Sequence, residues 1–455
     1  MLNETIAAIS TAHGKGGVAI IRISGDNALL VAKRVFSTKA NDIEPRRCYF
    51  GSILRDNDII DTGILTYYKA PASFTGEDVC EICCHGGIYV TQAVLESVLS
   101  SGAKMAGAGE FTKRAYINGK LTLSSAEAIG NVIDAKTDSQ LRLSSSVARG
   151  VLSSKVADIR EKMIALISQA YATVDYPDED IEEATREQME NTLNLVLREL
   201  EILKKSYRAG KAVCEGIKTA IVGKPNAGKS SLYNMLLGEE VAIVTDIAGT
   251  TRDVIEHTVS VGGVTLNLAD TAGIRHSLDT VEKIGIERAR QKLDSSELLL
   301  CVFDQGQEEN EEDEYILDSA LGKCAIAIIN KIDTPPRISQ KFLEKIKSTC
   351  QRTVYVSTKN QEGYEELARV ISDLYDLGEI DLSNDAVISN ARQFSSVSLA
   401  LDDAKEAEEA LKFGQTPDIV LFALEKALAN LDMIDGRVAG EEIVNAIFSR
   451  FCVGK

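Results

Sequence analysis

The spacing of apolar positions changes twice along the chain and divides it into three kinds of structure. In the first 118 residues, short β-rich runs lie between turns that contain Gly and Pro. These runs are Val18 to Ile23, Thr62 to Lys69 and Asp78 to Cys84. Such a mixture predicts a small α+β domain.

Helical spacing begins at Ser124-Ser125-Ala126-Glu127, which has the S-x-x-E form of a helix capping box. No proline occurs between this sequence and Pro177, so residues 123–175 are predicted to form long helices. A second helical stretch runs from Thr185 to about Ala209, with leucines at intervals of three and four residues that predict a buried stripe. The leucines are Leu193, Leu197, Leu200 and Leu203.

The third pattern alternates apolar runs with helix-like stretches between about residues 216 and 378, which predicts a mainly parallel sheet. Helical spacing returns from about residue 386 and includes Ser396 to Lys412. The simplest packing joins the two helical regions in one bundle, with the α/β domain inserted between them. The predicted domains are 1–118 (α+β), 119–215 with 379–455 (helical, discontinuous) and 216–378 (inserted α/β).

Length and composition limit the class of protein. At 455 residues the chain exceeds one hydrophobic core, so two or three domains are expected. No apolar run approaches the roughly 18 residues of a membrane-spanning helix, and the start Met1-Leu2-Asn3-Glu4-Thr5 lacks the features of a signal peptide. Nine cysteines in apolar contexts are typical of a reducing compartment rather than of a disulfide framework. We therefore expect a cytoplasmic protein that does not enter a membrane.

The net charge of −18 argues against a protein that coats nucleic acid nonspecifically, because phosphate neutralisation supplies such affinity. It leaves room for a local basic patch, and four basic residues lie close together in the sequence: Lys104, Lys113, Arg114 and Lys120. The acidic run Glu308 to Glu314 is interpreted as a solvated loop.

A zinc site is the alternative interpretation of Cys80, Cys83, Cys84 and His85. A strand would turn Cys80 and Cys83 to opposite faces, and no second pair of residues has ligand spacing. We therefore favour cysteines that only pack.

A phosphate-binding loop is predicted at Gly223 to Ser230, where GKPNAGKS matches G-x-x-x-x-G-K-[ST]. It lies between the apolar run Thr219 to Val222 and the helix-like Ser231 to Leu237, the context that the motif requires. Glycines in such a loop let backbone N–H groups converge on phosphate oxygens at a helix N-terminus. Lys229 is expected to contact the β and γ phosphates, and the Ser230 hydroxyl to bind Mg²⁺.

Further nucleotide-binding motifs follow in the expected order. Gly249-Thr250-Thr251-Arg252-Asp253 offers a second hydroxyl for Mg²⁺ at Thr251, and Asp270-Thr271-Ala272-Gly273 offers a carboxylate near the metal and a glycine N–H near the γ phosphate. Asn330-Lys331-Ile332-Asp333 ends in a carboxylate that can accept from N1–H and the N2 amino group of guanine, which adenine does not offer. Ser357-Thr358-Lys359 fits the loop behind the base.

Together these motifs predict a Ras-like P-loop domain that binds and hydrolyses GTP. The predicted GTP-binding residues are Asn226, Ala227, Gly228, Lys229, Ser230, Ser231, Thr245, Asp246, Ile247, Ala248, Gly249, Thr250, Thr251, Asp270, Thr271, Ala272, Gly273, Asn330, Lys331, Ile332, Asp333, Ser357, Thr358 and Lys359.

Over essentially its whole length the chain resembles the MnmE (TrmE) family of tRNA uridine-modification GTPases. The resemblance rests on Arg22-Ile23-Ser24-Gly25, Phe74 to Asp78, Gly109 to Ala115, Asn118-Gly119-Lys120, Val281 to Arg288 and the ending Phe451-Cys452-Val453-Gly454-Lys455. The nucleotide domain inserted in a helical domain and the C-terminal pentapeptide make the resemblance more specific than the GTPase motifs alone.

The resemblance implies a homodimer formed through the N-terminal domains, with a tetrahydrofolate one-carbon carrier, 5-formyl or 5,10-methylene, bound where they meet. The implied folate-binding residues are Arg22, Glu81, Lys120 and Lys455, whose charges suit the carboxylates and pterin donors of such a ligand. Cys452 is either a small packing residue near a helix end or, as the resemblance implies, a thiol that takes part in the modification.

The resemblance also implies a mechanism of hydrolysis. Ile274 stands where many small GTPases carry a glutamine that orients water, and Glu282 is implied to act through water in its place. A K⁺ ion is implied in the place of an arginine finger, although Arg252 is near enough in sequence to be an alternative finger. The implied K⁺ ligands are Asn226, Thr245, Ile247 and Thr250.

The function implied by the resemblance is that of a K⁺-stimulated GTPase that acts with a flavoprotein resembling MnmG (GidA), in a heterotetramer. The pair would add an aminomethyl or carboxymethylaminomethyl group at C5 of the wobble uridine of certain tRNAs, with FAD carried only by the partner. Two alternatives stay open: a ribosome-assembly GTPase that binds RNA without modifying it, and a nucleotide-switched scaffold.

Overall fold

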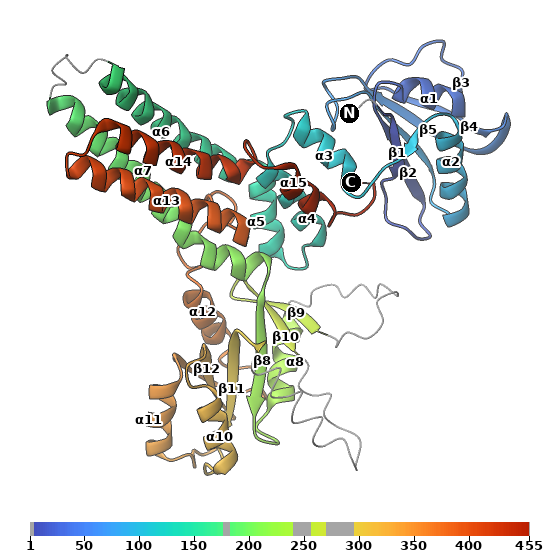
Figure 1. The fold of residues 1–455 in the computed structure, drawn as a ribbon. Coiled ribbons are helices and arrows are strands. Elements are labelled where there is room, and N and C mark those ends of the chain that lie inside the picture. Colours follow the sequence, from blue (N-terminus) through green and yellow to red (C-terminus); the bar gives the residue numbers. More distant parts are fainter. Residues whose placement is uncertain (1–3, 176–182, 240–255, 270–294, 455) are drawn as a thin grey trace. The chain divides into compact units, whose positions relative to one another are not determined.

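The computed structural model describes residues 4–175, 183–239, 256–269 and 295–454, which form two compact units (Figure 1). The first unit combines Met1–Gly130 with Asp432–Lys455, and the second is Asn131–Leu431. The C-terminal segment therefore folds with the N-terminal part of the chain.

A seven-stranded sheet with the order β3-β4-β5-β6-β2-β1-β7 forms the centre of the first unit. Its strands are β1 (Ile6–Ile9), β2 (Val18–Ser24), β3 (Phe36–Thr38), β4 (Cys48–Arg55), β5 (Asp58–Tyr68), β6 (Val79–His85) and β7 (Lys104–Met105). The three β-rich runs of the sequence correspond to β2, β5 and β6, and the α+β prediction is confirmed.

Helices α1 (Ala28–Val35) and α2 (Ile88–Ser100) cover one face of this sheet (Figure 1). Side chains at alternate strand positions, among them Ile21, Leu65 and Ile82, are fully buried in that core. The intervening positions point to the opposite face, where Ile64 is 40% exposed. One face of β2, β5 and β6 is therefore core, and the other presents side chains outward.

Helices α3 (Glu110–Ile117), α4 (Leu123–Asp134) and α15 (Glu441–Phe448) complete the first unit. The hydroxyl of Thr122 accepts from the backbone N–H of Ser125 at 3.1 Å and caps α4. Ser124 is buried instead, and its hydroxyl donates to the carbonyl of Ile434 at 2.7 Å. The capping box predicted at Ser124 is therefore wrong, because a distant segment of the chain uses this hydroxyl.

Long helices make up much of the second unit: α5 (Asp138–Ala148), α6 (Val151–Asp175), α7 (Glu183–Cys214), α13 (Ala391–Lys412) and α14 (Pro417–Asp435). Helix α7 packs against α5, α6 and α13. The leucine stripe of α7 is buried as predicted, with Leu200 fully inaccessible. None of the described helices combines the length and the apolar composition that a membrane-spanning helix requires.

A six-stranded sheet with the order β13-β12-β11-β8-β10-β9 forms the inserted domain. All its pairings are parallel except that of β9 with β10. The strands are β8 (Ile217–Gly223), β9 (Glu256–Val261), β10 (Val264–Ala269), β11 (Leu298–Asp304), β12 (Ala325–Asn330) and β13 (Arg352–Val356). The helices among its described residues are α8 (Lys229–Glu239), α10 (Glu311–Ser319), α11 (Gln340–Thr349) and α12 (Tyr364–Leu374). This confirms the predicted mainly parallel sheet.

The acidic run Glu308 to Glu314 is not a solvated loop. Asn310 and Asp313 form a capping box at the start of α10, with Asn310 Oδ1 accepting from the Asp313 N–H at 3.1 Å. Acidic residues are favoured there because the N-terminus of a helix carries partial positive charge. The run was misread because its local composition does not reveal that Asp313 is buried, with only 3% of its surface exposed.

Candidate functional site

The predicted phosphate-binding loop joins β8 to α8. Asn226 and Gly228 both have positive φ, at 62° and 103°. A Cβ on Gly228 would lie 2.0 Å from the side-chain nitrogen of Asn330, so only glycine fits at this position. The Lys229 ammonium donates to the carbonyls of Gly223 at 2.6 Å and Lys224 at 2.8 Å. Its charge is thus held within the loop that precedes α8.

The buried amide of Asn330 connects this loop to the predicted base-recognition segments. Its Nδ2 donates to the carbonyl of Ala227 at 2.9 Å, and its Oδ1 accepts from the backbone N–H of Thr358 at 3.2 Å. Asn330 ends β12 and Thr358 follows β13, so two neighbouring parallel strands deliver both segments to one edge of the sheet. The phosphate loop and the two base loops are therefore in direct contact.

Asp333 is exposed and has the charge that recognition of guanine needs. Its Oδ1 accepts from the Ser357 hydroxyl at 2.7 Å. This hydrogen bond is the main reason that the pKa of Asp333 lies below its usual value. The carboxylate is therefore oriented and ionised, with Oδ2 as a second acceptor.

Lys331 is held by a residue that the sequence analysis did not select. Its ammonium lies 2.6 Å from Oδ2 of Asp304, which is 3% exposed. Oδ1 of Asp304 accepts from the backbone N–H of Gly306 at 2.9 Å. Asp304 ends β11, beside β12, so its position at the carboxyl edge of the sheet was the available signal.

A second contact that the sequence analysis did not predict is a buried ion pair that holds the phosphate loop. The Lys224 ammonium lies 2.7 Å from Oδ2 of Asp313, and both side chains are almost completely buried. It also donates to the carbonyl of Glu308 at 3.3 Å. Two residues of the acidic run thus contact the loop that carries Lys229.

Of the other predicted nucleotide-site residues, Ser230, Ser231 and Lys359 are exposed, and Ile332 follows β12. Several predictions lie outside the described residues: Thr245, Asp246, Ile247, Ala248, Gly249, Thr250, Thr251, Asp270, Thr271, Ala272, Gly273 and Glu282, together with Ile274 and Arg252.

A separate polar site lies on the open face of the first sheet. Arg22 of β2 and Glu81 of β6 are directly opposite in the antiparallel register, and the Arg22 Nη2 to Glu81 Oε1 distance is 2.8 Å. The Arg22 guanidinium also lies over the rings of Phe74 and Phe111, at 5.3 and 5.7 Å from their centroids. Both charged side chains stay 21% exposed, which leaves them accessible to a ligand.

The other two predicted folate-binding residues are less informative. Lys120 is exposed, and its ammonium donates to the carbonyl of Pro71 at 3.1 Å. Lys455 lies outside the described residues.

The C-terminal tail is seated on the turn that precedes α3. Cys452 accepts a hydrogen bond at its carbonyl from Gly109 N–H at 3.4 Å, and Val453 forms an antiparallel bridge with Ala108. A Cβ on Gly454 would lie 2.1 Å from the carbonyl oxygen of Ile9, so the tail packs closely. Cys452 itself is exposed.

The cysteines of β6 pack in the core, except for Cys83. Burial raises the pKa of Cys80 to about 12 and that of Cys84 to about 11, so both remain thiols at neutral pH. Cys83 points to the opposite face of the strand, and the ring of His85 pairs with Asp61 at 2.7 Å. Among the described residues, no three His, Cys, Asp or Glu side chains are grouped as metal ligands.

Of the four basic residues that lie close together in the sequence, Arg114 is not part of any surface patch. Arg114 is 1% exposed and lies inside the first unit. Lys104 pairs with Glu4, and Lys113 donates to the side chain of Asn445. Successive residues of a helix point in different directions, so Arg114 is buried although its neighbour Lys113 is not.

Comparisons with known proteins cover nearly the whole chain. The family model of the GTP-binding protein TrmE N-terminus matches residues 5–120, and that of the MnmE helical domain matches residues 123–452. The tRNA modification GTPase MnmE of Thermoanaerobacter pseudethanolicus is 40% identical over 461 residues, with 100% of both chains covered. That of Clostridioides difficile is 40% identical over 459 residues, again with 100% of both covered. Among solved structures, the G domain of the T. maritima FeoB iron transporter is 30% identical, with a TM-score of 0.26, and covers 35% of this chain and 98% of that one.

Proposed function

The chain belongs to the MnmE family of tRNA modification GTPases, and on that premise we propose that it is a K⁺-stimulated GTPase that modifies the wobble uridine of certain tRNAs. As a member of that family it is a GTP hydrolase in tRNA modification. The finer proposal is that it adds an aminomethyl or carboxymethylaminomethyl group at C5, using a tetrahydrofolate one-carbon unit.

The buried amide of Asn330 is the observation that carries the nucleotide part of the proposal. It joins the phosphate loop at Ala227 to the Thr358 backbone. Asp333, three residues later, is exposed and oriented by Ser357. An acceptor-only carboxylate in this place favours guanine, because N1–H and the N2 amino group are both donors. GTP would lie with its base against Asp333 and its phosphates at the N-terminus of α8.

The donor set also suits Mg²⁺ and K⁺. The Ser230 hydroxyl is exposed in the first turn of α8, as a Mg²⁺ ligand there requires, and Thr251 would supply the second hydroxyl. The exposed Asn226 has a side-chain oxygen available for K⁺, which Thr245, Ile247 and Thr250 would complete. Lys229 would neutralise phosphate charge, and Glu282 would orient the attacking water in the place of the missing glutamine.

The ion dependence gives a direct test. We expect hydrolysis to rise in K⁺ and to stay low in Na⁺ at equal ionic strength. The matched variant Asn226→Ala should lose this stimulation while it retains GTP binding. Equal rates of the unmodified chain in the two salts would contradict the K⁺ proposal.

The open face of the first sheet supports the proposed homodimer and folate site. Arg22 and Glu81 lie paired on that face, and Phe50 and Ile64, opposite one another on β4 and β5, are 73% and 40% exposed. Exposed apolar residues around a charged pair suit a contact with a second copy of this domain. The guanidinium of Arg22 and the carboxylate of Glu81 would bind the folate there, with Lys120 and Lys455 at its glutamate carboxylates.

The proposed partner is a flavoprotein of the MnmG (GidA) type, bound in a heterotetramer, with FAD on the partner only. tRNA is the proposed substrate and the cytoplasm the proposed location. Cys452, exposed on the seated tail, would take part in the modification step. Nucleotide-driven movement of the inserted domains would regulate that step rather than perform it.

The wobble-uridine nucleoside profile of cells that lack the chain tests the function as a whole. We expect the C5-modified nucleoside to disappear and to return with the wild-type gene but not with a Cys452→Ser variant. An unchanged profile would refute tRNA modification and favour an RNA-binding GTPase of ribosome assembly.

A further inference from the structure

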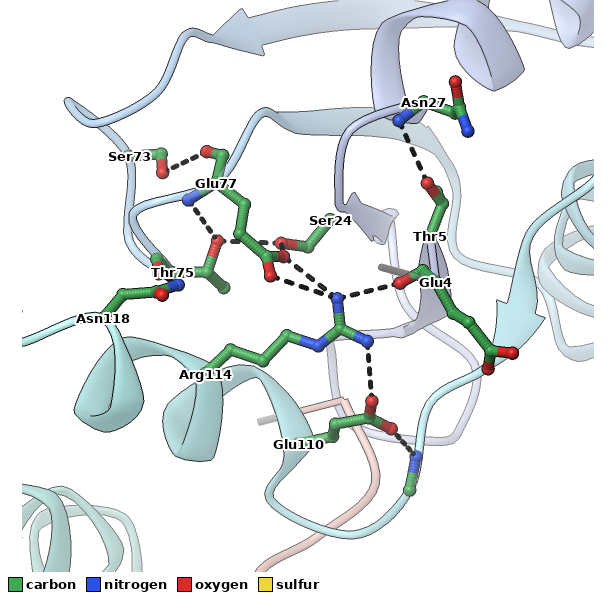
Figure 2. Close-up of polar contacts among 11 residues, drawn as sticks. Glu4, Thr5, Ser24, Asn27, Ser73, Thr75, Glu77, Glu110, Arg114 and Asn118 are labelled. Carbon is green, nitrogen blue, oxygen red and sulfur yellow. Dashed lines mark hydrogen bonds and ion pairs between the residues drawn. The ribbon is translucent and has the colours of Figure 1, made fainter. Parts of the chain in front are cut away.

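Arg114 has the largest fully buried side chain in the described part of the molecule, with 1% of its surface exposed. Its Nη1 donates to the Glu4 carbonyl at 2.9 Å and to Glu77 Oε2 at 3.0 Å, and its Nη2 donates to Glu110 Oε1 at 2.8 Å (Figure 2). One guanidinium thus holds two carboxylates that come from different segments.

Glu77 belongs to the segment between β5 and β6. Its Oε2 accepts from the Ser24 hydroxyl at 2.8 Å, and its backbone carbonyl accepts from the Ser73 hydroxyl at 2.5 Å (Figure 2). The same segment carries Phe74, whose ring lies against the Arg22 guanidinium. Through Glu77, Arg114 therefore holds the segment that lies beside the pair of Arg22 and Glu81.

Glu110 belongs to the turn on which the C-terminal tail rests. Its Oε2 accepts from the backbone N–H of Gly107 at 2.7 Å and closes this turn (Figure 2). Gly109, in the middle of the turn, donates to the carbonyl of Cys452. Gly109 has a φ of 61°, and a Cβ there would lie 2.7 Å from the carbonyl oxygen of Phe448, which ends α15, and 3.0 Å from the Cβ of Phe451, so the turn packs closely against the segment that leads into the tail.

We propose that Arg114 is a positioning residue for the Cys452 thiol, because it ties the turn under the C-terminal tail to the segment beside Arg22 and Glu81. The planar fork of an arginine can hold both carboxylates at once, which a lysine ammonium on its flexible stem cannot do with the same geometry. The proposal rests on the proposed function only in giving Cys452 a part in the modification.

A purely stabilising role is the competing explanation. Buried ion pairs are weak indicators of stability, since apolar replacements are often as stable. The Nε of Arg114 is moreover buried without a hydrogen-bond partner among the described residues. An unsatisfied buried donor adds nothing to stability, so this arrangement favours a residue whose role is to connect Glu77 with Glu110.

The test measures the reactivity of individual thiols in the full-length protein. Iodoacetamide labelling, followed by peptide mass spectrometry, would compare Cys452 with Cys48, which is also exposed in the first unit. Cys80 and Cys84, 0% and 2% exposed, report any general opening of the domain. We expect Arg114→Lys to raise the Cys452 to Cys48 labelling ratio by about threefold or more, because it loosens the tail locally, while Cys80 and Cys84 stay protected.

Two further variants sharpen this test. Glu110→Gln keeps an oxygen for Gly107 but loses the charge that faces Arg114, and it should raise the ratio in the same way. Arg47→Lys changes an exposed arginine, paired with Glu44 on the surface of the same unit, and should leave the ratio unchanged. If Arg114→Lys unfolds the domain, Glu110→Gln decides the question.

An unchanged ratio in folded Arg114→Lys or Glu110→Gln protein would overturn the positioning role. A parallel rise at all four cysteines in both variants would also overturn it and favour stabilisation alone. Labelling requires no tRNA, so its outcome is independent of the wobble-uridine profile that tests the proposed function.

Discussion

Replacement of Lys224 by methionine should destabilise the inserted domain, because it leaves the Asp313 carboxylate buried without its cation. The two side chains are 6% and 4% exposed and lie 2.7 Å apart. Removal of one partner from a buried pair costs about 3–5 kcal/mol. We expect the lower end, about 3 kcal/mol, because Asp313 Oδ2 still accepts from the Asn310 N–H at 3.2 Å.

Urea unfolding is best followed at Cys301, since the chain has no tryptophan and this fully buried residue of β11 reports on the inserted domain. Pulsed alkylation along the titration gives the midpoint for that domain. With a slope of about 2 kcal/mol per molar urea, the loss corresponds to a midpoint about 1.5 M lower.

A double-mutant cycle separates the pair from its surroundings. Asp313→Asn removes the charge but keeps an oxygen for the capping box, so Lys224→Met combined with Asp313→Asn should recover most of the lost stability. Lys345→Met is the matched control. Lys345 of α11 pairs with Glu314, which lies in α10 next to Asp313, but Lys345 is 45% exposed. Such surface pairs contribute about 0–1 kcal/mol. The reasoning is refuted if Lys224→Met is as stable as its parent, or if the double variant is no more stable than Lys224→Met alone.

Three other changes test separate parts of the structure. Asp333→Ala should weaken the binding of GTP by about 1.5–3 kcal/mol and leave the binding of ATP unchanged. Competition of GTP and ATP against a fluorescent GDP analogue measures both affinities, and a preference for GTP as strong as that of the parent would contradict the role of Asp333. Gly210→Ala should lower the melting temperature although alanine is the better helix former, since its Cβ would lie 2.0 Å from the Ile388 carbonyl oxygen; an equal or higher melting temperature would contradict this. Burial tends to raise the pKa of Glu199, but hydrogen bonds from Lys162 and Lys155 outweigh this effect, and the pKa is lowered. The stabilisation that the ionised Glu199 contributes is therefore present at neutral pH and is lost as the pH falls through the lowered pKa. Glu199→Gln should therefore flatten the loss of stability of the helical bundle below about pH 4.5, as measured by circular dichroism at a series of pH values, and an unaltered acid profile would contradict it.

Much of the fold could be predicted from local patterns. The alternation in β2 and β6, the three- and four-residue leucine spacing of α7 and the alternating runs around β8 each depend on residues a few positions apart. Periodicity of this kind determines which face of an element is apolar, and it predicted the elements and the mainly parallel inserted sheet. Three of the predicted nucleotide residues, Ala227, Asn330 and Thr358, are in contact, because β8, β12 and β13 run in the same direction and end at one edge of the sheet.

The errors came from contacts between distant segments. Thr122 rather than Ser124 caps α4, because Ser124 donates to the carbonyl of Ile434. Asp313 is buried rather than solvated, because it pairs with Lys224. Neither partner is near in the sequence, so no local signal could reveal it.

The sequence by itself predicted many of the helices and strands, the mainly parallel sheet of the inserted domain and the order of the nucleotide motifs, because these depend on short spacings and residue types. Only the tertiary structure decided which charges are buried and what they hold, as with Arg114 between Glu77 and Glu110. The physical reason is that the identity of a charged residue does not reveal whether its side chain lies in water or in a core. Its energetics depend on burial and on partners that folding alone brings within reach.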